Sequence, residues 1–108
     1  MKKLLFICTS KPTTDAAAEE YLDAALACAA MSFDVCICFS GDGLEQLNRN
    51  IAPSNIQTKL EMTPVYNIET VAVEPTATEE ELVNINVTSL NQPEYKQLID
   101  RCDHVIHL

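Results

Sequence analysis

The stretch that decides the fold is DVCICFSGDG, at residues 34–43. It begins as a continuous apolar run and ends in the turn residues Ser-Gly-Asp-Gly. A short apolar run bounded by turn residues is typical of a strand that a parallel sheet buries on both faces. A similar run, KKLLFICTS at residues 2–10, precedes it in the chain. The sequence therefore predicts two buried strands in its first part.

The residues between these two strands predict a helix. Residues 16–31 are rich in alanine, and the early positions hold Glu19 and Glu20, where the helix dipole favours acidic side chains. The polar residues 13–15 offer N-cap side chains. One apolar face recurs at helical spacing: Tyr21, Leu22, Ala25 and Leu26. Strand, helix and strand in this order predict a βαβ unit with parallel strands and a right-handed crossover.

The rest of the chain continues the alternation of helices and strands. The expected elements are a turn and short helix in GDGLEQLNRN (41–50), a short helix in IQTKLEM (56–62), a strand in ETVAVEP (69–75), an extended or strand segment in VNINV (83–87), and a last strand in DHVIHL (103–108). Two capping signals predict helix starts: Thr78 with Glu81, and Asn91 with Glu94 ahead of a helix that ends near Arg101.

This order of elements predicts a three-layer α/β fold with a mainly parallel sheet of four or five strands, flavodoxin-like in class, built as one domain over residues 1–108. In such sheets, ligands and reactive groups gather at the carboxyl ends of the strands. The expected places for a functional site are therefore residues 8–14, 40–44 and 74–78.

Composition and charge exclude several classes of protein. The formal net charge is −9 with only seven lysines and arginines, so we expect no direct binding of nucleic acid. The apolar run near the start, residues 4–8, is shorter than a secretory signal needs, and no stretch has the length of a membrane span. Five cysteines is an odd number, and most lie in apolar segments, as is typical of a reducing compartment. We expect a cytoplasmic protein that does not contact membranes.

The first loop, CTSKPTT at residues 8–14, resembles two kinds of phosphate site without completing either. A tyrosine phosphatase of low molecular weight would carry an arginine where this chain has Thr14. A flavodoxin-like phosphate loop would carry glycines where this chain has Lys11 and Pro12. We therefore expect no nucleotide, flavin or other cofactor.

The cysteines and histidines do not form a reactive pattern. Cys36 and Cys38 point to the same face of one strand, with a spacing too long for an unstrained disulfide, so we interpret them as core residues. Cys8 lies at a strand end and is the best candidate for a reactive thiol. His104 and His107 would face opposite sides of their strand and could not share a metal. The sequence predicts no catalytic, cofactor-binding or metal-ligating residue.

Several segments together resemble a known family. They are KKLLFICTSKP, AAAEEYLDAALACAA, DVCICFSGDGLEQL, YNIETVAVE and the ending CDHVIHL, and in this order they resemble the DsrE/DsrF-like sulfur-relay family, in particular its TusC (DsrF) subunits. The chain departs from the family at residues 19–21, where relatives usually carry glycine and arginine before Leu-Asp.

The resemblance implies a role in sulfur transfer within a complex. TusC-type subunits form a heterohexamer with TusB-type and TusD-type subunits, and this relay passes persulfide sulfur toward the 2-thiolation of the wobble uridine of certain tRNAs. The tRNA would be reached only through downstream relay proteins. DsrF-type relatives serve dissimilatory sulfur oxidation, and the sequence leaves this alternative open.

The resemblance also implies which residue to compare with the sulfur carrier. In these complexes the carrier is a cysteine of the D-type or E-type subunit, directly after the third strand. Here Glu74 and Pro75 occupy that place. A carboxylate cannot accept sulfane sulfur and would repel an anionic persulfide, so we expect a non-catalytic subunit. A sulfurtransferase that uses its own thiol, Cys8, is the alternative.

Overall fold

The computed structural model describes residues 2–11, 17–75, 78, 80–83 and 85–107. Its elements follow in the order β1 (Lys3–Cys8), α1 (Ala17–Ala30), β2 (Asp34–Phe39), the 3-10 helix η1 (Gly41–Leu47), α2 (Ser54–Met62), the 3-10 helix η2 (Thr63–Tyr66), β3 (Glu69–Val73), β4 (Thr88–Leu90), α3 (Gln92–Arg101) and β5 (His104–His107). None of the helices in the described part of the chain is long and apolar enough to cross a membrane.

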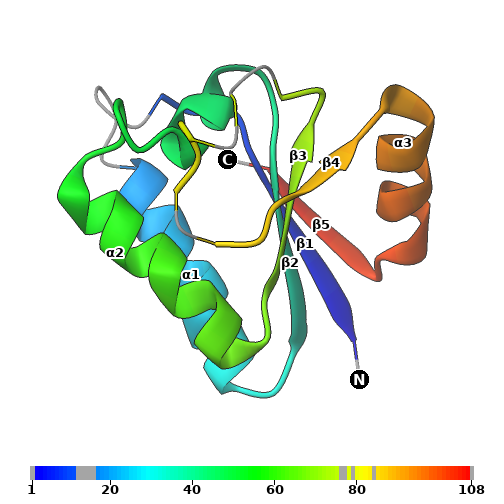
Figure 1. The fold of residues 1–108 in the computed structure, drawn as a ribbon. Coiled ribbons are helices and arrows are strands. Elements are labelled where there is room, and N and C mark those ends of the chain that lie inside the picture. The colour runs from blue at the N-terminus through cyan, green and yellow to red at the C-terminus, as the bar shows by residue number, and fades with distance from the viewer. Residues whose placement is uncertain (1, 12–16, 76–77, 79, 84, 108) are drawn as a thin grey trace.

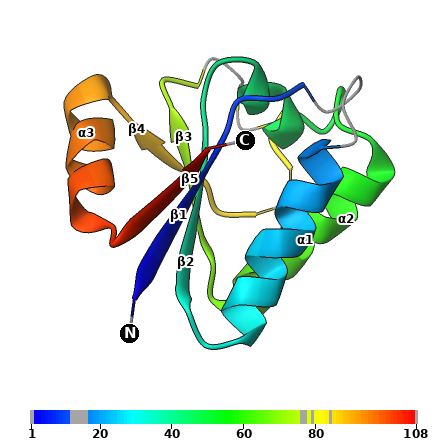
Figure 2. The ribbon, with the colours of Figure 1, turned by 180° about the vertical axis from the view of Figure 1, so that it is seen from behind.

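The five strands form one sheet in the order β4-β3-β2-β1-β5. Every pair of neighbouring strands is parallel. Helices α1 and α2 cover one face of this sheet and α3 covers the other (Figures 1 and 2). The expected three-layer α/β fold is therefore confirmed, with five strands and a wholly parallel sheet.

Each face of the sheet has its own core. The core under α1 and α2 includes Phe6, Cys8, Tyr21, Leu22, Ile37, Phe39, Leu47, Ile56 and Leu60. The core under α3 consists of Leu5, Ile7, Cys36, Cys38, Val71, Val73 and Leu98. Successive side chains of a strand point to opposite faces, so β1 and β2 supply both cores in alternation. This is why their sequences are apolar throughout.

The second capping signal is realised as predicted. The Asn91 side chain accepts a hydrogen bond from the backbone N–H of Glu94, and the Glu94 carboxylate accepts one from the backbone N–H of Asn91. This reciprocal pair satisfies two N–H groups that a helix start leaves without partners. Helix α3 then runs to Arg101, where the sequence predicted its end.

Other local expectations need correction. Thr78 and Glu81 do form their hydrogen bonds, but Glu80 and Glu81 lie in a turn and open no helix. The short strand β4 lies just after VNINV, because its backbone pairs with residues 71–73 of β3 at the sheet edge. The helix predicted in residues 41–50 is the 3-10 helix η1. The predicted N-caps at residues 13–15 lie outside the described residues.

Candidate functional site at the carboxyl edge of the sheet

The carboxyl ends of the central strands meet at one edge of the sheet. Cys8 at the end of β1 is level with Phe39 of β2, and Phe39 is level with Ala72 of β3. Helix η1 follows β2 directly and packs over this edge (Figure 1). The described parts of the three segments that the sequence selected therefore lie together, as parallel strands require.

Cys8 is buried beneath η1. Its side chain is 1% exposed. The Gln46 side chain, which is fully buried, donates hydrogen bonds from Nε2 to the Cys8 sulfur and to the backbone oxygen of Ser10, the latter at 2.9 Å. The thiol expected to be the most accessible is thus enclosed by a neighbouring amide. Gln46 was not selected from the sequence. Its only signal was that it is a polar residue at a position of GDGLEQL that faces the core.

Gly43 allows η1 to approach β1 this closely. A Cβ atom at position 43 would lie 2.0 Å from the backbone oxygen of Cys8 and 3.1 Å from the Cα atom of Thr9. Real Cβ atoms do not approach backbone atoms so closely, so any other residue would push η1 away from the strand. The Asp42-Gly43 pair that the sequence placed in a turn therefore has a packing role through its glycine.

The remaining thiols pack against the two cores, and three of them have suppressed acidity. Cys36 and Cys38 are fully buried under α3, which confirms their interpretation as core residues. Burial raises the pKa of Cys36 above its ordinary value and raises the pKa of Cys38 to about 12. Burial also raises the pKa of Cys102, which packs at the margin of the same core. Cys28 is half-buried against the core under α1 and α2. At neutral pH the first three are thiols rather than thiolates.

The two histidines lie apart from each other on the last strand. His104 and His107 are exposed at the two ends of β5. In the part of the chain that the structure describes, no group of three histidine, cysteine, aspartate or glutamate side chains could hold a metal ion.

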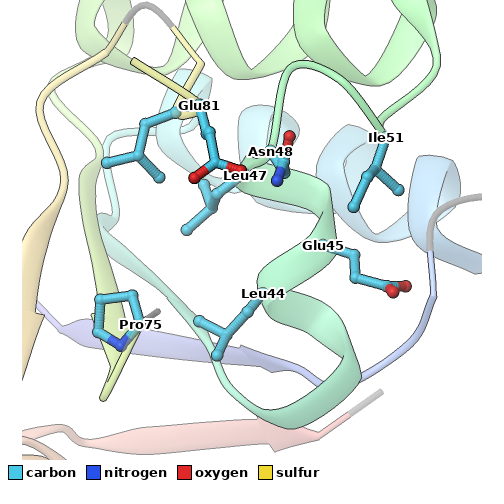
Figure 3. Close-up of a pocket in the computed structure, with 8 residues that line it drawn as sticks. Leu44, Glu45, Leu47, Asn48, Ile51, Pro75 and Glu81 are labelled. Carbon is cyan, nitrogen blue, oxygen red and sulfur yellow. The ribbon is translucent and has the colours of Figure 1, made fainter. Parts of the chain in front are cut away.

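A cavity of about 290 Å³ opens beside η1 at the same edge (Figure 3). Its lining residues are Leu44, Glu45, Leu47, Asn48, Ile51, Pro75, Glu81 and Leu82. One wall is η1 and the residues after it, and the other is formed by Pro75 with residues 81–82. The walls are joined by a short antiparallel bridge between Asn48 and Leu82.

The bridge fixes the second wall of the cavity by two backbone hydrogen bonds. The N–H of Arg49 donates to the oxygen of Glu81, and the N–H of Val83 donates to the oxygen of Leu47, each at 2.8 Å. The position of the Glu81 side chain relative to η1 is therefore set by backbone contacts.

The Glu81 carboxylate is ionised and held in place. Its Oε1 accepts hydrogen bonds from the backbone N–H of Thr78 at 3.0 Å and from the Thr78 hydroxyl at 2.9 Å. These hydrogen bonds, the backbone one first, lower the pKa of Glu81, and Asn48 contributes to the lowering. The cavity thus carries a fixed negative charge.

Glu74 adds a second feature to this edge. It is exposed, directly follows β3 and has a left-handed backbone with φ of 48°. Its N–H donates to the oxygen of Leu90 at 2.8 Å, which ties the left-handed turn to the end of β4. Glutamate rarely adopts this conformation, so the turn is strained, and strain of this kind clusters at functional edges.

Comparisons with known proteins agree with this fold. Residues 2–108 match the DsrE/DsrF-like family. A "Protein TusC homolog" from Aliivibrio fischeri is 31% identical over 98% of both chains. Another from Vibrio parahaemolyticus is 37% identical over 68% of this chain and 66% of that protein. The crystal structure of the ychN protein from E. coli has the same fold, with a TM-score of 0.84 at 19% identity over the full length of both chains. The chain belongs to the DsrE/DsrF-like family and is similar to members named TusC homologs.

Proposed function

We propose that this chain is a non-catalytic subunit of a cytosolic sulfur-relay complex, which passes persulfide sulfur toward 2-thiolation of the tRNA wobble uridine. The observation that carries the proposal is Glu74, directly after β3, where the carrier subunit of such a relay keeps its cysteine. A carboxylate has no sulfur to extend into a persulfide. The similarity to proteins named TusC homologs supports the relay itself.

The chemistry of sulfur transfer supports a non-catalytic role. A thiolate must attack the terminal sulfur of the donor persulfide, so the acceptor needs both access and a depressed pKa. Cys36 and Cys38 have neither, since they are fully buried and their pKa values are raised. Cys8 is also buried, beneath Gln46. The carboxylates of Glu74 and Glu81 would further oppose an anionic persulfide at this edge.

The partners follow from the same reasoning. A subunit that carries no sulfur contributes by completing the assembly, so the chain would associate with TusB-like and TusD-like subunits in a heterohexamer. A net charge of −9 disfavours direct contact with tRNA, which would be reached through later relay proteins.

A deletion strain tests the pathway. We expect loss of the 2-thio group from the tRNA wobble uridine when the gene is deleted, measured by mass spectrometry of digested tRNA. Complementation with the wild-type chain and with Cys8→Ala should both restore the modification. Unchanged thiolation in the deletion strain would reject the proposal, and a loss of sulfur oxidation instead would assign the chain to a DsrF-like complex.

Intact-protein mass spectrometry tests the non-catalytic role. The purified complex is supplied with a cysteine desulfurase, a sulfur carrier protein and cysteine, and is sampled during turnover. We expect an added sulfur atom on the TusD-like subunit, which serves as the internal control, and none on this chain. A perthiolated Cys8 here would establish the alternative, a sulfurtransferase that uses its own thiol.

A further inference from the structure

We propose that the cavity beside η1 receives an arginine side chain from a loop of a partner protein. The aliphatic part of that side chain would lie on the apolar walls, and its guanidinium would meet the Glu81 carboxylate. The inference rests on the proposed function only in that the partner is taken to be another subunit of the complex.

The walls of the cavity suit an aliphatic chain. Leu44 and Pro75 face one another across it in Figure 3, and Leu47 forms part of its floor. Ile51 also lines the cavity and is 42% exposed, which leaves it open to a contact from outside. Arginine covers apolar surface with its stem while keeping its charge at the edge, and it is enriched at protein interfaces.

The charge of the cavity selects a cation. Glu81 and Glu45 are both among its lining residues, and the lowered pKa of Glu81 keeps its carboxylate charged. Two hydrogen bonds from Thr78 hold the Glu81 carboxylate before any partner arrives, so little side-chain entropy is lost on binding. An anionic occupant, such as a phosphate or a persulfide, would be repelled.

The described part of the chain places no cation on these carboxylates. Within the described residues, no salt bridge reaches Glu45 or Glu81, and Lys59 instead pairs with Glu19 and Asp23 on α1. Arg49 directly follows Asn48 in the chain, and its backbone N–H is the group that contacts Glu81. A cation from another molecule would complete the site.

The size of the cavity favours a side chain over a larger ligand. A volume of about 290 Å³ lies at the lower limit of sites for drug-sized molecules, which begin at about 300 Å³. Arginine suits the site better than lysine, because its guanidinium is less strongly hydrated and presents five donors in a planar fork. The Glu81 carboxylate already accepts hydrogen bonds from Thr78 and from the Asn48 side chain, so a spread of donors can reach the acceptor sites that remain.

The first test is a titration of the isotope-labelled full chain with the capped peptide acetyl-Gly-Arg-Gly-amide, followed by amide NMR shifts. We expect saturable shifts at residues 44–51 and 81–82, weakened by added salt. The same peptide with citrulline removes the charge at nearly constant shape and should bind at least several-fold more weakly. Equal shifts with both peptides, or none with arginine, would overturn the inference. Shifts at the same amides on concentrating the chain alone would assign the cavity to a second copy instead.

Variants separate charge from structure. Glu81→Gln should weaken binding of the arginine peptide by about twofold to fivefold, the effect of one partly exposed ion pair. Thr78→Ala removes one hydrogen bond to Glu81 and leaves the charge, so it should retain most of the binding. Glu61→Gln, an exposed change on α2, is the matched control. Equal affinities for Glu81→Gln and the wild type would contradict the role of Glu81.

A second measurement distinguishes this inference from the proposed function. Wild type and Glu81→Gln are each co-expressed with the TusB-like and TusD-like subunits, and dissociation of the complex is followed on dilution. Faster dissociation of the variant supports the arginine contact. A complex that forms equally well with both chains rejects the contact and keeps the proposed function, whereas failure of the wild type to assemble rejects the proposed function itself.

Discussion

The two faces of the sheet are built from the same strands but have different chemistry. Under α3, the buried side chains are aliphatic residues and the thiols of Cys36 and Cys38. Under α1 and α2, the core also holds polar groups without a hydrogen-bond partner among the described residues, namely Tyr21 Oη, Gln46 Oε1 and Thr70 Oγ1. Buried polar atoms cost free energy unless they are satisfied. The described part of the α3 face is therefore an apolar packing surface, whereas the α1/α2 face also buries less favourable polar groups, among them Gln46 beside the candidate site.

The largest expected effect comes from the anchor of α3. Leu98 is 1% exposed and is the buried residue of that helix. Leu98→Ala should lower the free energy of unfolding by about 3 kcal/mol, because the change leaves a cavity under α3. Denaturant unfolding measures this, with Gln97→Ala, an exposed change, as the control. A loss below about 1 kcal/mol would mean that the α3 face is not the packed face.

At the carboxyl edge, the feature to test is the close approach of Gly43 to the backbone of β1. Gly43→Ala places a methyl group 2.0 Å from the Cys8 oxygen and should destabilise the fold by about 2 kcal/mol through displacement of η1. Gly41→Ala has open space but a φ of 55°, and should cost about 1 kcal/mol from backbone strain alone. Thermal unfolding of both variants compares the steric clash at position 43 with the backbone strain at position 41. A larger loss of stability for Gly41→Ala than for Gly43→Ala would show that η1 does not pack tightly on β1.

Alkaline pH should act on the thiols of the α3 face. The pKa of Cys38 is about 12 in the folded chain against an ordinary value of 9.0, so above pH 9 the unfolded chain releases a proton that the folded chain keeps. The contribution of the Cys38 thiol to the free energy of unfolding is complete below pH 9 and is lost progressively as the pH rises toward 12. At pH 10.5 the loss should be about 1–2 kcal/mol. The stability of Cys38→Ala should fall less steeply with pH. Parallel curves of stability against pH for the wild type and Cys38→Ala would show that the Cys38 thiol does not cause the loss.

Serine substitutions compare the two faces directly. Cys38→Ser puts a hydroxyl into an apolar core and should cost about 1.5 kcal/mol. Cys8→Ser should cost less, since the Gln46 amide that contacts the sulfur can donate to a hydroxyl in the same place. Urea unfolding of both variants gives the difference. Equal losses of stability would mean that the Gln46 amide does not stabilise a hydroxyl at position 8.

The smallest effect is expected at Glu74. Its left-handed backbone suits asparagine better than glutamate, so Glu74→Asn should stabilise the chain by about 0.5 kcal/mol. Differential scanning calorimetry can detect the corresponding rise in melting temperature. A destabilised variant would show that the glutamate side chain makes a contact that offsets the strain.

Much of the fold could be predicted from the sequence because its signals are local. Continuous apolar runs marked β1 and β2, and the Asn91–Glu94 pair marked the start of α3. Strand β4 was placed slightly early, because a three-residue strand depends on pairing with β3 rather than on its own pattern. Thr78 and Glu81 form the predicted hydrogen bonds, yet the backbone bridge of the following residues to η1 leaves a turn there.

The candidate site was only partly predictable. The sequence selected the carboxyl ends of the strands and the acidic Glu74, and these do lie at one edge. It favoured Cys8 as the most accessible thiol, and the structure buries that thiol under Gln46. It did not associate η1 with Glu81, because the bridge that joins them links residues far apart in the chain.

By itself, the sequence determined the class of fold, the burial of Cys36 and Cys38, and the presence of a carboxylate after the third strand. These depend on hydrophobic periodicity and on residue type, which are local properties. Only the tertiary structure decided that Gly43 seats η1 on β1, that Gln46 encloses Cys8, and that Glu81 is held at the cavity. Each of these depends on distances between segments that chain folding alone brings together.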